Sequence, residues 1–134
     1  MRPFSTVHAV AATLLAVGLV LQVFLAGLGV FDDPSFFMTH RDMGYTLEAV
    51  ALVCLVVAAL ARAGRSQVGL TALVLGLFFV QSILVGVRDT APMVAALHPV
   101  NGFLILFLSI GLARQAWRTA RTPLPDAVAS GAMG

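Results

Sequence analysis

Residues 7–30 read VHAVAATLLAVGLVLQVFLAGLGV, and no acidic or basic side chain other than one histidine interrupts them. A run of this length matches the roughly 20 apolar residues with which a helix crosses about 30 Å of hydrocarbon. Three more such runs follow, at residues 43–61, 68–87 and 93–117. They lack the alternation of barrel strands, so we predict helices. The short connections predict an all-α fold, an up-down bundle of four transmembrane helices over residues 1–121.

The composition places most of the chain in lipid. Of 134 residues, 60% are hydrophobic and 10% are charged, and the mean hydropathy is +0.99. The net charge of +2 comes from arginine alone, without a basic stripe, so nucleic acid is not expected as a partner. The single cysteine, Cys54, excludes an internal disulfide and a metal cluster built from thiolates.

The distribution of arginine predicts the orientation. Six arginines fall on the side of the termini and two on the other side. The positive-inside rule therefore predicts a multi-pass protein of a bacterial plasma membrane with the N-terminus and C-terminus cytoplasmic. Residues 122–134 are small and polar, with two prolines, and we expect a disordered cytoplasmic tail there.

The first helical hairpin aligns with the second through its polar residues and glycines. At an offset of 59, Gln22 and Gly27 match Gln81 and Gly86. At an offset of 58, His40 and Gly44 match His98 and Gly102. Glutamine and histidine are rare and costly in membrane spans, so their coincidence predicts an internal repeat of two pseudo-symmetric hairpins.

The repeat places one histidine on the second helix and one on the fourth, in the same outer leaflet. These helices lie diagonally in an up-down bundle, and two imidazoles can bridge that gap through one iron atom. We therefore expect His40 and His98 to be the axial metal ligands of a haem b. The other expected cofactor-binding residues are the four glycines of the repeat, which leave room for the macrocycle, the glutamines as donors and an arginine for a propionate: Gly44, Gly102, Gly27, Gly86, Gln22, Gln81 and Arg41.

A structural interpretation remains open for each residue. The histidines and glutamines can serve only as hydrogen bonds between helices, and the glycines can serve only close packing. His8 has no histidine opposite it and predicts no second haem. Glu48 has a leucine as its counterpart, and we expect it to be protonated, part of a proton path, or paired with a hydroxyl. The candidate hydroxyls are those of Thr46, Thr71 and Ser82.

The chain resembles one four-helix half of the haem A synthase family. The matching motifs are His40-Arg41-x-x-Gly44 at the start of the second helix, Gln81-x-x-x-x-Gly86 at the end of the third, and His98 opening the fourth. The catalytic half of that family has a glutamate three residues before the first histidine, where this chain has Phe37, and outer-loop cysteines are absent. The resemblance therefore implies the non-catalytic haem b half. The chain also looks like small uncharacterised four-helix membrane proteins of high-GC bacteria.

Two functions follow as hypotheses. The first is a b-type cytochrome that transfers electrons with quinol or a partner oxidoreductase in the membrane, without catalysis at the iron. The second is a haem-free structural or assembly subunit of a membrane complex. The lipid bilayer is the expected environment in both, and a homodimer is compatible with either.

Overall fold

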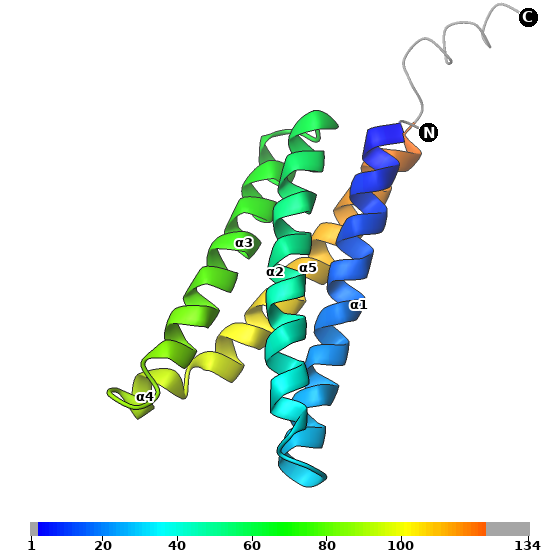
Figure 1. Ribbon diagram of the computed structural model, residues 1–134. Coiled ribbons are helices and arrows are strands. Elements are labelled where there is room, and N and C mark those ends of the chain that lie inside the picture. Colours follow the sequence, from blue (N-terminus) through cyan, green and yellow to red (C-terminus); the bar gives the residue numbers. More distant parts are fainter. Residues whose placement is uncertain (1–2, 123–134) are drawn as a thin grey trace, which may run out of the picture.

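The computed structural model describes residues 3–122, and every regular element in this range is a helix. The elements, shown in Figure 1, are α1 (Pro3–Phe31), α2 (Phe36–Leu60), α3 (Arg65–Gly86), α4 (Pro92–Ala95) and α5 (His98–Arg121). The all-α prediction is confirmed, and α4 and α5 together make the fourth span. The predicted disordered tail falls almost entirely on residues 123–134, which lie outside the described residues.

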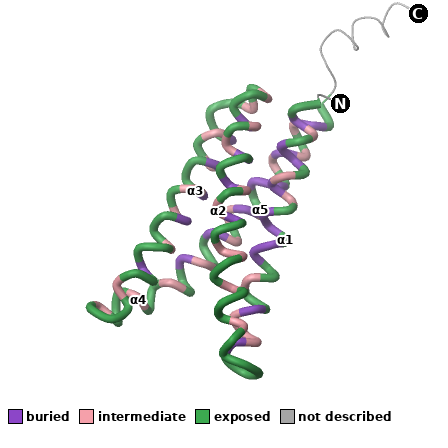
Figure 2. Tube along the Cα trace, viewed as in Figure 1, coloured by how far each residue is buried: buried purple, intermediate pink, exposed green. Residues whose placement is uncertain are grey.

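The four spans expose most of their apolar surface. Each is long and apolar enough to cross a membrane, yet only 17% to 33% of its most apolar window is buried within the chain. Figure 2 shows the exposed positions on all of the long helices. Exposing so many leucine, valine and phenylalanine side chains to water would be unfavourable, whereas exposing them to lipid is not. The chain is therefore a multi-pass membrane protein.

The turn between α1 and α2 contains a local start signal for the second span. The backbone N–H of Ser35 donates a hydrogen bond to Asp33 Oδ1 at 2.8 Å. This hydrogen bond lowers the pKa of Asp33 below its ordinary value. Pro34 separates the two residues and limits how far α1 can continue.

The fourth span is broken, which corrects the prediction of one continuous helix over residues 93–117. α4 ends at Ala95, a turn covers Ala96 and Leu97, and α5 begins at His98. The physical cause is Pro99, which has no N–H to donate to the carbonyl of Ala95 and whose ring crowds that carbonyl. The break places His98 in the first turn of a helix instead of inside one.

The core is shared by all four spans. α1 packs against α2 and α5, and α3 packs against α5 and α2. The main buried cluster takes side chains from each long helix: Leu15, Leu19, Leu47, Ala51, Val74, Phe78 and Ile105. These neighbour relations between the helices are those of the predicted up-down bundle.

The end of the bundle where α1 begins and α5 finishes is packed through small residues. Two buried clusters join these helices there, one of Ala9, Ala116 and Ala120 and one of Ala12, Leu112 and Ala113. Small side chains let two helix backbones approach closely. Toward the other end, the α1–α2 hairpin and the α3–α5 hairpin diverge (Figure 1).

Candidate functional site

The two histidines of the repeat meet between the diverging hairpins. His40 is the fifth residue of α2 and His98 is the first residue of α5. Their ring centroids lie 6.2 Å apart, and the ring planes make an angle of 63°. Both side chains are half-buried. The structure thus brings together two residues that are 58 positions apart in the sequence and belong to diagonally placed helices.

The first histidine is oriented by the backbone of α1. His40 Nδ1 lies 3.0 Å from the carbonyl oxygen of Gln22. A carbonyl can only accept, so Nδ1 carries the proton and Nε2 keeps its lone pair. In the described part of the chain no hydrogen bond is formed by Nε2 of His40. A histidine that donates one ring nitrogen to a carbonyl and keeps the other free is arranged as metal-binding histidines are.

The second histidine belongs to a network of side chains between α3 and α5. The Gln81 side-chain N–H donates to the carbonyl oxygen of His98 at 3.0 Å and lies 3.2 Å from His98 Nε2. Asn101 Nδ2 donates to Gln81 Oε1 at 2.6 Å and to the carbonyl oxygen of Leu77 at 3.0 Å. Donation by Gln81 puts the imidazole proton on Nδ1 of His98, which is buried without a partner among the described residues.

Asn101 was missed by the sequence analysis. It is buried, and it follows His98 by one helical turn in an otherwise apolar run, which is the signal that identifies it. Its counterpart in the first hairpin, at the offset of 58, is Met43. Methionine cannot donate to a glutamine oxygen, and Gln22 Oε1 is buried without a hydrogen-bond partner in residues 3–122. The two halves of the repeat therefore differ at one donor.

The glycines one turn after each histidine occupy equivalent places. A Cβ at Gly44 would lie 3.1 Å from Gln22 Nε2, and a Cβ at Gly102 would lie 3.2 Å from Gln81 Nε2. In this structure the glutamine amides fill the room in front of both glycines. By contrast, no atom lies within 4 Å of a Cβ built at Gly27 or Gly86.

The other predicted residues lie apart from this site or point away from it. Arg41 is exposed and pairs with the neighbouring Asp42 at 2.9 Å. His8 is buried at the opposite end of α1, and its Nε2 has no partner among the described residues. Of the hydroxyls considered for Glu48, those of Thr46 and Thr71 donate to backbone carbonyls of their own helices, and only that of Ser82 lines the same pocket as the carboxyl.

The distance between the histidines is compatible with one metal ion between them. Two imidazoles on opposite sides of an ion, with metal–nitrogen bonds of about 2.0 Å, have ring centres about 6 Å apart. The observed 6.2 Å agrees with that value. No group of three or more histidine, cysteine or acidic side chains within residues 3–122 is arranged to hold a bare metal ion. Haem iron needs only two axial ligands from the protein, so the spacing of the pair is compatible with haem, but the glutamine amides beside Gly44 and Gly102 occupy room that the macrocycle would need.

These features define a four-helix membrane protein with a histidine pair inside one end of the bundle. The model of a family of unknown function, DUF6220, matches residues 22–91, just over half of the chain, and the chain therefore belongs to that family. The match includes Gln22, His40 and Gln81 and ends before His98. No curated protein and no solved structure matches the chain.

Proposed function

We propose that the protein is a b-type membrane cytochrome in which His40 and His98 are the axial ligands of one haem. The observation that carries this proposal is the 6.2 Å separation of the two imidazole centroids between facing helices. A haem held by two neutral imidazoles supplies one-electron transfer, with no vacant coordination position for oxygen.

The residues of the chain have distinct roles in this proposal. The carbonyl of Gln22 holds His40 with Nε2 available, so α1 orients the first ligand. Nε2 of His98 is the second ligand, and it must exchange the Gln81 amide for the iron. Gln81 remains anchored during that exchange because Asn101 and the carbonyl of His98 still bind it.

The arginine distribution supports an orientation in which the histidine end of the bundle lies in the outer leaflet of a bacterial plasma membrane and both termini are cytoplasmic. Electrons would then pass between a quinol or a partner oxidoreductase in the membrane and an outer acceptor. Phe37, in place of a catalytic glutamate, favours electron transfer over haem A synthase activity.

The absorption spectrum of gently solubilised protein, expressed with ample haem supply, tests the proposal. The reduced protein is expected to show the sharp bands of six-coordinate low-spin haem and to bind carbon monoxide poorly. His40→Ala and His98→Ala each remove one strong ligand, so each variant should lose haem or become high-spin. His8→Ala is the matched control and should leave the spectrum unchanged.

One observation favours the alternative, a haem-free structural or assembly subunit. The Asn101–Gln81–His98 network joins α3 to α5 without a cofactor, as interhelical hydrogen bonds in membrane proteins do. Folded wild-type protein that contains no haem under these conditions would establish this alternative. In that case His98→Ala should lower stability without any spectral change.

A further inference from the structure

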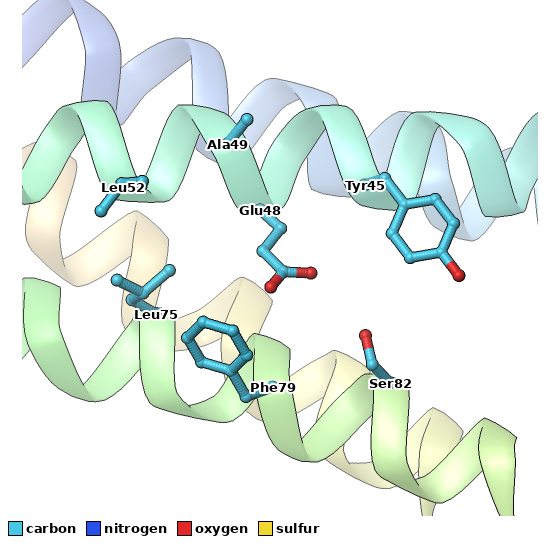
Figure 3. Close-up of a pocket in the computed structure, with 7 residues that line it drawn as sticks. All are labelled: Tyr45, Glu48, Ala49, Leu52, Leu75, Phe79 and Ser82. Atoms are coloured by element: carbon cyan, nitrogen blue, oxygen red, sulfur yellow. The ribbon is translucent and has the colours of Figure 1, made fainter.

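An open cavity of about 440 Å³ lies between α2 and α3, and its residue Glu48 is two helical turns along α2 from His40. Figure 3 shows its lining, in which the carboxyl group of Glu48 and the hydroxyl of Ser82 project between the two helices. The complete lining is Tyr45, Glu48, Ala49, Leu52, Leu75, Phe79 and Ser82. Five of these seven residues are exposed, so the cavity is open toward the lipid and not enclosed by the chain.

The carboxyl of Glu48 has no partner within the chain. Glu48 forms no hydrogen bond and no ion pair with any other residue of the described range 3–122, and it is only half-buried. It is the middle residue of α2, so about 18 Å of helix lies on either side at 1.5 Å per residue. A carboxyl group at that depth, without water, is costly unless another polar group reaches it.

The position of the cavity restricts what can reach Glu48. The exposed Arg41–Asp42 pair lies six to seven residues from Glu48 along α2, about 9 to 11 Å, so the carboxyl lies below the lipid headgroups, among acyl chains that carry no polar atoms. The occupant must therefore dissolve in hydrocarbon and bring a small polar group with it. The rings of Tyr45 and Phe79 border the cavity, and they favour a flat aromatic group over a flexible chain.

We propose that this cavity binds the aromatic headgroup of a membrane quinol or quinone, and that Glu48 forms a hydrogen bond with one of its oxygens. A protonated Glu48 donates to a quinone carbonyl, and an ionised Glu48 accepts from a quinol hydroxyl. Ser82 supplies a second polar contact from α3. Tyr45 follows Gly44 and Ser82 follows Gln81, so one end of the cavity lies at about the same height along the two helices as the histidine site. The inference rests on the proposed cytochrome function and names its substrate class.

Equilibrium binding of a radiolabelled naphthoquinone with a short isoprenoid tail tests the site. The protein is held in lipid nanodiscs and measured with haem loaded and with haem withheld. Wild type should bind one equivalent saturably in both preparations. Glu48→Leu should weaken binding about tenfold, because it removes one strong hydrogen bond. Glu48→Gln keeps a hydrogen-bonding end and should bind more tightly than Glu48→Leu.

Two variants that fill the cavity from opposite helices, Ala49→Phe and Leu75→Trp, should abolish saturable binding. Val20→Phe introduces the same ring at an exposed position of α1 and should bind as wild type does. Wild type without saturable binding, or both filled variants with wild-type affinity, would overturn the inference. The haem content of protein expressed with ample haem supply is measured separately. If that protein binds quinone but contains no haem, the cytochrome proposal is refuted and the site stands, and if it contains haem but binds no quinone, the site is refuted and the cytochrome proposal stands.

Discussion

The hydrogen bond from Asn101 to Gln81, which has no counterpart in the first hairpin, makes a quantitative prediction. Asn101→Leu removes the donor to Gln81 Oε1, and Gln81→Leu removes the acceptor. In a double-mutant cycle the two changes should show a coupling free energy of about 1 kcal/mol, since interhelical hydrogen bonds in membrane proteins contribute roughly 0.6 to 1.7 kcal/mol. Unfolding in mixed micelles with increasing dodecyl sulfate, followed by circular dichroism, measures the free energies.

The first hairpin supplies the matched cycle. Met43→Leu and Gln22→Leu change the equivalent positions, but Met43 makes no hydrogen bond to Gln22 Oε1. The coupling free energy there should be close to zero. Equal coupling free energies in both cycles would show that packing, and not the hydrogen bond, couples Asn101 to Gln81. The proposed difference between the two hairpins would then be wrong.

Two further predictions concern topology and the α2–α3 connection. In a Cys54→Ala background on intact cells, an impermeant maleimide should label Asp33→Cys but not Ser66→Cys, and the reverse pattern would contradict the arginine count. Gly64 has a φ of +84° and a ψ of 155°, a conformation essentially restricted to glycine, so Gly64→Ala should lower the free energy of unfolding by about 1 to 3 kcal/mol. Gly69→Ala, inside α3 with no atom within 4 Å of the new Cβ, should instead raise it by up to about 1 kcal/mol, and equal effects would refute the backbone argument.

The spans were predictable because length and hydropathy are properties of the local sequence. The approach of His40 to His98 could also be anticipated, since it depends on a repeat that the polar residues reveal. The break at Pro99 was present in the sequence but was lost in a count of apolar positions, because proline interrupts a helix without lowering its hydropathy.

The contacts inside the site were harder to predict. The direction in which the glutamine side chains turn depends on which partners the other helices offer. Gln81 finds a donor in Asn101, and Gln22 does not find one in Met43. Room beside Gly44 and Gly102 was expected for a macrocycle, but a glycine only creates space, and its occupant is decided by neighbouring helices. These side-chain contacts depend on the tertiary structure and leave no periodic signal in the sequence.

The alanine-packed seam between α1 and α5 affects the bilayer unequally. At that end of the bundle, buried alanines close the contact between α1 and α5. In the opposite leaflet the hairpins stand apart, and lipid tails or a bound molecule must complete the cross-section. We therefore expect lateral pressure in that leaflet to act on the separation between His40 and His98, while pressure in the other leaflet meets the closed α1–α5 contact. The spacing of the two imidazoles would then depend on the surrounding lipid as well as on the protein.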